Sequence, residues 1–242
     1  MTRRVPAVRA ELIAVARALD AAGLVPNKSG NLSCRSRGGF IVTPAGVPYC
    51  DLSPGLLVEV GSGDGDEGRH SRPSSEWRMH AAVYERRPEL AAIVHTHSLC
   101  ATALACAGRG IPSFHYMIAL AGGDVRCAPY ATFGTSELAE AAVRALDGRR
   151  AALLANHGVV AAGASLREAL AVAVEVENLA GQYLAMLAAG LEPLLLPDDE
   201  LQRVIEKFGE YGRLDRPRPA GRPGSPGHVE GRATGLHVHG DT

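Results

Sequence analysis

Short apolar runs of strand length alternate in this chain with longer segments whose apolar residues recur at helical spacing. The first helical stripe runs from Val8 to Ala22 and is closed by Gly23, and the runs 90–96 and 151–155 suit buried strands. This interleaving predicts an α/β or α+β fold in which helices cover a sheet. Further helices are expected at residues 75–86, 98–107, 136–146, 166–189 and 198–209, and a hairpin at residues 31–43.

The C-terminal 28 residues differ from the rest in composition, with four prolines, six glycines and no aromatic residue. Such a segment buries too little apolar surface to offset the entropy of ordering it. We therefore expect a disordered tail at residues 215–242. The folded part is then one domain over residues 1–214, a size that can bury a substantial core.

The charges are nearly balanced, with 25 lysines and arginines against 26 aspartates and glutamates. Because there is no basic excess, nucleic acid is not expected as a partner. No apolar run approaches the roughly 20 residues of a membrane span, and no apolar segment follows the early arginines as in a signal peptide. The five cysteines form no C-x-x-C pair. These features predict reduced thiols in a cytoplasmic protein.

Lysine is scarce, since only Lys28 and Lys207 stand beside 23 arginines. Catalysis through a covalent imine requires a desolvated lysine amine. Lys28 lies in a polar run and Lys207 in a charged stretch near the C-terminus, so neither is expected to be buried. The sequence therefore disfavours Schiff-base chemistry.

Histidines follow two of the expected strands. His95 and His97 close an apolar run, and alternate residues of a strand point to the same face, so both imidazoles can share one metal ion. His157 also follows a short apolar run. Three imidazoles leave a position open, as in catalytic zinc sites. Glu76, at the start of an expected helix, is the best candidate for an accompanying carboxylate.

Histidine pairs alone are a weak signal in this chain. His237 and His239 have the same spacing as the first pair but lie in the expected tail. It is the combination of a strand-borne pair, a second strand-borne histidine and a helix-opening glutamate that indicates a metal site. His80, four residues after Glu76, is explained by an ordinary hydrogen bond between these two side chains on one helix face.

Three polar loops lie at residues 29–33, 43–46 and 73–75. Each contains small hydroxyl or amide side chains, so a ligand could come close to its backbone. Their N–H groups could surround an anion such as a phosphate, without a lysine. For any single loop taken alone, an ordinary turn is the more common explanation.

At these residues the chain resembles the class II aldolase/adducin family, in order over residues 5–214, and residues 111–135 resemble its L-fuculose-1-phosphate aldolase branch. The motifs that carry the resemblance are Gly30-Asn31-Leu32-Ser33, Thr43-Pro44-Ala45-Gly46, Ser74-Ser75-Glu76-Trp77 and His95-Thr96-His97, then residues 111–118, 121–123 and 127–135, Lys207-Phe208 and Tyr211-Gly212.

The resemblance implies a three-layer α/β/α sandwich with a mainly antiparallel central sheet, and a homotetramer with active sites between subunits. It implies one Zn²⁺ per subunit, held by His95, His97 and His157, with Glu76 as the acid/base. The other residues it implies are Tyr116 of the neighbouring subunit and Tyr211 as catalytic groups, Phe133 in the aldehyde pocket, and Asn31, Thr43, Gly46, Ser74 and Ser75 for binding the substrate, chiefly its phosphate.

The implied reaction is the reversible cleavage of a ketose 1-phosphate, with L-fuculose 1-phosphate as the first candidate, to dihydroxyacetone phosphate and an aldehyde such as L-lactaldehyde. Cleavage produces an enediolate, and a metal must stabilise its charge where no imine forms. One departure from the family is Ala45, at a position that often carries a hydroxyl. Loss of a hydrogen bond to a charged ligand costs about 1.5–3 kcal/mol.

Other functions remain open at this point. The same metal site would serve a pentulose-phosphate 4-epimerase, another deoxyketose-phosphate aldolase or a dehydratase. A non-catalytic adducin-like interaction module is expected to have lost metal ligands or the glutamate, whereas all four are present here. Metal-dependent hydrolysis has the ligands but gives no reason for the Tyr116 and Tyr211 motifs.

Overall fold

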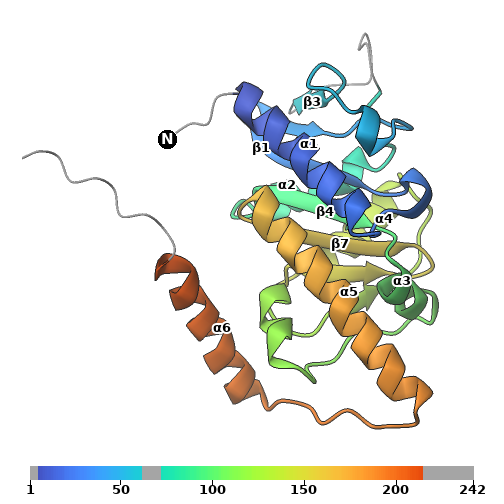
Figure 1. Cartoon of the computed structure of the whole chain (residues 1–242), viewed down its shortest axis with the longest axis vertical. Coiled ribbons are helices and arrows are strands. Elements are labelled where there is room, and N and C mark those ends of the chain that lie inside the picture. The colour runs from blue at the N-terminus through green and yellow to red at the C-terminus, as the bar shows by residue number, and fades with distance from the viewer. Residues whose placement is uncertain (1–4, 62–71, 215–242) are drawn as a thin grey trace, which may run out of the picture.

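A computed structural model describes residues 5–61 and 72–214 of the chain, with side chains up to residue 209 (Figure 1). The helices are α1 (Val5–Ala21), α2 (Trp77–Arg86), α3 (Leu99–Cys106), α4 (Ser136–Ala145), α5 (Leu166–Ala188) and α6 (Asp198–Leu214). Short 3-10 helices are η1 (Pro26–Lys28), η2 (Tyr49–Asp51) and η3 (Tyr116–Ala121). The strands are β1 (Asn31–Ser36), β2 (Gly39–Val42), β3 (Val58–Gly61), β4 (Ala92–Thr96), β5 (Arg126–Ala128), β6 (Ala151–Leu154) and β7 (Gly158–Gly163).

The strands form one seven-stranded sheet in the order β3-β2-β1-β4-β7-β6-β5. Every neighbouring pair is antiparallel apart from β5 and β6, which are parallel. This arrangement confirms the expected, mainly antiparallel central sheet. The central strand β4 is buried along its whole length, because helices cover both faces of the sheet there.

The helices form a layer on each side of the sheet (Figure 1). On one face α1, α3 and α5 pack on the strands around a core that includes Leu12, Leu19 and Leu104. On the other face α2 and α4 pack against each other, and a second core includes Met79 and Leu138. The three layers confirm the α/β/α fold class, and the two cores hold the strand ends in fixed positions.

The expected helices and hairpin are present, with ends that differ by a few residues. The hairpin is the β1–β2 pair, and Ser165 Oγ accepts the N–H of Glu168 at the start of α5, as its capping pattern predicts. Strands β3, β5 and β7 were not among those expected. Strand β7 is made of small residues between two glycines, and β5 has only three residues, so neither carries a strong strand pattern. The Gly/Asp-rich composition of residues 61–69 also predicts a surface loop; its residues 62–69, and the tail predicted at 215–242, lie outside the described residues.

Helix α6 stands apart from the layers on a linker that follows α5 (Figure 1). It packs on η3, where the ring of Phe208 lies parallel to that of Tyr116 with their centroids 6.3 Å apart. In the part of the chain that the structure describes, no helix has the length and apolarity needed to span a membrane.

Candidate active site

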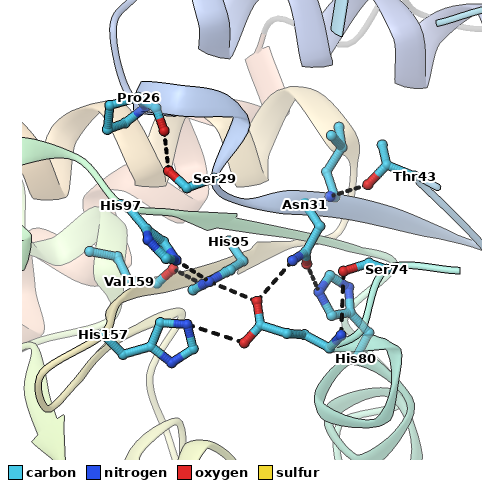
Figure 2. Close-up of polar contacts among 12 residues, drawn as sticks. Pro26, Ser29, Asn31, Thr43, Ser74, His80, His95, His97, His157 and Val159 are labelled. Atoms are coloured by element: carbon cyan, nitrogen blue, oxygen red, sulfur yellow. Dashed lines mark hydrogen bonds and ion pairs between the residues drawn. The ribbon is translucent and has the colours of Figure 1, made fainter. Parts of the chain in front are cut away.

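The three histidines of the predicted metal site come from two neighbouring places in the sheet. His95 lies in β4 and His97 directly follows that strand, so the alternation of side chains sends both to the same face. His157 lies in the tight turn that joins β6 to β7. Because β7 pairs with β4, this turn brings His157 beside the end of β4. Figure 2 shows the three imidazoles pointing toward one another.

Two glycines allow the backbone to approach closely at this point. A Cβ atom on Gly158, directly after His157, would lie 2.4 Å from the carbonyl oxygen of Thr96. Gly30 has φ +104°, and a Cβ atom there would lie 2.5 Å from the carbonyl oxygen of His95. Any larger residue would displace a strand end that carries a histidine. The glycines therefore serve the geometry of the site.

Glu76 completes the cluster from the start of α2. Its Oε2 lies 3.0 Å from Nε2 of His95, and its Oε1 lies 3.2 Å from Nε2 of His157. Nε2 of His95 also lies 3.0 Å from Nε2 of His97. One ligand atom from each of the four residues falls within 4.8 Å of the others. Imidazole nitrogens and a carboxylate oxygen at these separations are a donor set that fits a divalent metal ion such as Zn²⁺.

The tautomer of His95 suits metal binding. Its Nδ1 lies 2.8 Å from the carbonyl oxygen of Val159, which can only accept a hydrogen bond, so Nδ1 carries the proton. The lone pair of a neutral ring is then on Nε2, which faces the cluster. A backbone carbonyl that fixes an imidazole in this way is the usual outer support of a metal-ligating histidine.

Electrostatics in the cluster favour an ionised carboxylate. Burial by itself raises the pKa of Glu76, but the facing imidazoles of His95 and His157 and an N–H of Asn31 outweigh burial, so the pKa lies well below its usual range. Burial lowers the pKa of His95, but the Glu76 carboxylate more than reverses this and raises it. Burial and the other two imidazoles lower the pKa of His97 to about 4.

The cluster lies at the edge of a cavity of about 360 Å³, a volume suited to a small metabolite. All three predicted polar loops line it, and the third of them is the turn before α2. Of the residues predicted for substrate binding, the lining includes Asn31, Gly46, Ser74, Ser75 and Phe133, together with Ala45 and Tyr130.

Thr43 is placed differently from the prediction that it binds substrate. Its side chain is buried beneath the cavity wall, and its Oγ1 accepts the N–H of Leu32 at 3.2 Å (Figure 2). Thr43 therefore supports the loop that carries Gly46.

Neither of the two predicted catalytic tyrosines is found in the lining of this cavity, among the side chains that the structure describes. Tyr116 is 53% exposed on η3 and lines a separate apolar hollow with Phe208 and Val204. Tyr211 belongs to the end of α6, and its side chain is not among those described.

Lys28 lines the cavity, although the sequence argument left lysine out of the anion site. It is exposed, as expected, and it lies directly before the loop that contains Asn31. Both Lys28 (φ +63°) and its neighbour Asn27 (φ +54°) have left-handed backbone conformations, which are uncommon for residues other than glycine. In the sequence, the polar run 26–30 that leads into the predicted loop at 29–33 was the signal that could have indicated Lys28.

The hydrogen bond predicted between His80 and Glu76 is wrong. The His80 ring is fully buried, and its nitrogens instead contact side chains of β1 across the layer. Nε2 lies 2.6 Å from Oδ1 of Asn31, and Nδ1 lies 2.6 Å from Oγ of Ser33. His80 does lie on the same helix face as Glu76, but its ring nitrogens are in hydrogen-bond contact with Asn31 and Ser33 of β1 instead.

Comparison with known proteins finds relatives over most of the chain. The family described as "Class II Aldolase and Adducin N-terminal domain" matches residues 10–184. A 5-methylthioribulose-1-phosphate/5-deoxyribulose-1-phosphate aldolase of Rhodospirillum rubrum is 48% identical over 207 residues, which cover 85% of this chain and 93% of the relative. An L-fuculose phosphate aldolase of Escherichia coli is 47% identical over 192 residues, covering 78% and 88%.

Among solved structures, an L-fuculose 1-phosphate aldolase superposes with a TM-score of 0.80 at 41% identity, over 84% of this chain and 96% of that one. The chain therefore belongs to the class II aldolase and adducin family, in which it is one of the aldolases, enzymes of the lyase class. The resemblance noted in the sequence is confirmed. The relatives act on more than one sugar phosphate.

Proposed function

We propose that this protein is a Zn²⁺-dependent aldolase that reversibly cleaves a ketose 1-phosphate to dihydroxyacetone phosphate and an aldehyde. The observation that carries the proposal is a single cavity that is lined both by residues of the histidine–carboxylate cluster and by a cation and small polar groups. A phosphorylated ketose has the matching pattern, because its phosphate and its reacting carbons are separate groups.

His95, His97 and His157 would hold the metal, and Glu76 would remain available for proton transfer. When bound, Zn²⁺ supplies a Lewis acid for the negative charge that develops on the substrate oxygens. Lys28 is exposed, so its amine lacks the desolvation that imine chemistry requires.

The phosphate would lie among Lys28, Asn31, Gly46, Ser74 and Ser75, which line the same cavity. The Lys28 ammonium adds a positive charge next to the loop in which Ala45 provides no hydroxyl. Hydrogen bonds and ion pairs to a phosphate are stronger than those to neutral groups, so this end would anchor the substrate.

Cleavage breaks the bond between C3 and C4 of the ketose. The hydroxyl proton on C4 leaves to Tyr116 as the C4 carbonyl forms, and the electron pair of the broken bond goes to C3. Glu76, after taking up a proton from solvent, then delivers it to C3, while Tyr116 returns the C4 proton to solvent; this yields dihydroxyacetone phosphate, and in synthesis Glu76 removes the same proton from C3. The low pKa of Glu76 keeps it ionised in the metal-free protein, ready for the synthetic direction.

The aldehyde end of the cavity is lined by the exposed rings of Phe133 and Tyr130. The substrates named for the relatives are all ketose 1-phosphates that end in an apolar methyl or methylthio group. L-Fuculose 1-phosphate, which would release L-lactaldehyde, is our first candidate. A 5-deoxyribulose 1-phosphate is the second, because a relative named for it is 48% identical.

We also propose a homotetramer in which active sites lie between subunits. Tyr116 is exposed and outside its own subunit's cavity, as a residue that serves a neighbouring site would be. Leu99, two residues after His97, is 80% exposed and would be available to such an interface. Tyr211 would reach the site from the end of α6.

Product analysis tests this function. The purified protein is incubated with dihydroxyacetone phosphate and a series of aldehydes, with and without a chelator, and the products are separated by chromatography. L-Lactaldehyde and acetaldehyde should both react, and an unbranched apolar aldehyde should react better than a charged one. If no aldehyde yields a ketose 1-phosphate, the proposed function is wrong. An epimerase would instead interconvert pentulose 5-phosphates.

A further inference from the structure

A chain of buried hydrogen bonds runs from the acid/base candidate into the protein. Asn31 Nδ2 donates to Glu76 Oε2 at 3.0 Å, and Asn31 Oδ1 lies 2.6 Å from His80 Nε2. On the other side of the ring, His80 Nδ1 lies 2.6 Å from Ser33 Oγ, which lies 2.8 Å from the hydroxyl of Tyr84. All five side chains are buried.

The repeats of the two elements explain how these residues meet. Asn31 and Ser33 are alternate residues of β1, so they point to the same face of the sheet. Glu76, His80 and Tyr84 are spaced four apart at the start of and along α2, so they lie along one side of that helix. One row of side chains from the strand therefore faces one row from the helix, and Figure 2 shows Asn31 beside His80.

The donor and the acceptor of each hydrogen bond in this series follow from the groups at its two ends, Glu76 and Tyr84. The NH₂ group of Asn31 faces Oε2 of Glu76 and donates to it, so Oδ1 of Asn31 faces His80. Nε2 of His80 must then carry a proton and donate it to Oδ1. Because the fully buried ring has no carboxylate partner, it is neutral, and Nδ1 accepts the O–H of Ser33. Ser33 Oγ accepts in turn from Tyr84, whose pKa is raised by burial, so its hydroxyl keeps the proton.

We propose that His80 is a positioning residue for the proposed aldolase reaction, which acts by fixing the orientation of the Asn31 amide. An amide can rotate by half a turn and exchange its oxygen for its nitrogen with little change in shape. In the rotated state Oδ1 of Asn31 would face the Glu76 carboxylate, and the two oxygens would repel each other. The Nε2–H of His80 opposes this rotation, because it has a hydrogen-bond acceptor only in the observed orientation.

The consequence for catalysis concerns both ends of the substrate. With the amide held, one N–H of Asn31 fixes the Glu76 carboxylate beside the metal ligands, and the second N–H of the same group is left for the substrate phosphate. A single buried ring thereby sets the position of the acid/base and of an anchoring donor. This inference rests on the proposed function, but the hydrogen-bond directions do not.

The test combines kinetics with nitrogen NMR. His80→Phe removes both ring nitrogens, whereas His80→Gln keeps an N–H that reaches Asn31. We expect His80→Phe to lower kcat about tenfold to a hundredfold, because the Asn31 amide can then rotate and its hydrogen bond to the charged Glu76 carboxylate is lost, and His80→Gln to recover most of it. Val83→Ala, which shortens a buried side chain on the same helix, is the control for loosened packing and should keep the wild-type kcat.

The NMR measurement uses the metal-free wild-type protein labelled with ¹⁵N-histidine, assigned with the Gln variant. His80 should show a protonated Nε2 and an unprotonated Nδ1 across neutral pH. A proton on Nδ1 would overturn the proposal, and so would a wild-type kcat in His80→Phe with normal metal content. If His80→Phe does not fold, kcat is compared between His80→Gln and His80→Asn, whose side chain is too short to reach Asn31. A kcat retained in His80→Gln and lost in His80→Asn supports the proposal, and equal kcat values in the two variants would overturn it. If the wild-type enzyme cleaves no ketose phosphate, the proposed function fails while the NMR result still decides the orientation.

Discussion

Glu76 and His95 are in direct contact, with Oε2 of the carboxylate 3.0 Å from Nε2 of the imidazole in a buried cluster. His95 Nδ1 is already engaged with a backbone carbonyl, so its Nε2 is the atom available to a metal. A carboxylate that touches this nitrogen lies next to any ion bound there. In the proposed reaction Glu76 would therefore be placed to move a proton on a substrate bound at such an ion.

Substitution of this carboxylate gives the first prediction. Glu76→Gln should keep the fold and the bound metal but lower kcat by about a hundredfold to ten-thousandfold, the usual contribution of a general acid–base group. Steady-state kinetics and metal analysis of the same preparation measure both quantities. A variant with near-normal turnover would remove Glu76 from the acid/base role.

Removal of the metal gives the second prediction. A chelator should abolish cleavage, added Zn²⁺ should restore it, and the metal-loaded protein should unfold at a higher temperature because the ion binds only the folded cluster. Activity and thermal unfolding are followed on one sample through the cycle. Cleavage that resists the chelator would reopen imine chemistry, and borohydride trapping at Lys28 would then be the next experiment.

The position of Lys28 gives the third prediction. Lys28→Ala should raise KM for the sugar phosphate about two- to fivefold with little change in kcat, because an exposed cation contributes modestly to binding. The difference between variant and wild type should shrink at high salt. Arg37→Ala, which removes an exposed cation from the hairpin turn, is the control. A fall in kcat without a change in KM would contradict a role in phosphate binding.

The burial of His80 gives a prediction for stability against pH. Burial holds its pKa at about 3, against 6.5 in an unfolded chain, so below pH 6.5 the unfolded state takes up a proton that the folded state does not. This group therefore lowers stability as pH falls, by about 1.4 kcal/mol per pH unit between pH 6 and pH 4. Urea unfolding of the metal-free protein at several pH values and one protein concentration measures the slope. His80→Phe should have a shallower slope, and equal slopes would show that His80 is protonated in the folded state.

Sharing of active sites gives the fifth prediction. Tyr116→Phe and Glu76→Gln should each be nearly inactive, but a one-to-one mixture that is unfolded and refolded together should regain activity. In a randomly assembled ring about one quarter of the sites receive both intact residues from adjacent subunits. Activity no higher than the sum of the separate variants would place both residues in one subunit. Light scattering of the wild-type protein measures the tetramer directly.

Much of the fold could be predicted because the apolar patterns are long. Helices such as α5, with its capping serine and extended stripe, follow from periodicity alone. Strand β7 could not be predicted, because its small residues between two glycines resemble a loop, yet it is the strand that brings His157 to β4. The pairing order of strands depends on contacts between distant residues, which spacing does not contain.

The metal cluster could be predicted in part for a similar reason. Alternation on one strand is local, so the shared face of His95 and His97 follows from the sequence. The partners of His80 lie on β1, far away in the chain, so a helix-face argument paired the ring with the wrong residue. Lys28 and Thr43 show the same limit, since a turn's conformation decides which side chain faces the cavity and which is buried beneath it.

The most direct test of a metal-dependent aldolase is the release of dihydroxyacetone phosphate from a ketose 1-phosphate. The purified, Zn²⁺-loaded protein is incubated with L-fuculose 1-phosphate and, separately, with 5-deoxyribulose 1-phosphate, and the triose phosphate is measured by a coupled enzyme assay. We predict release from at least one of them, lost with a chelator and in Glu76→Gln. No release from either substrate, or release that survives both treatments, would contradict the assignment.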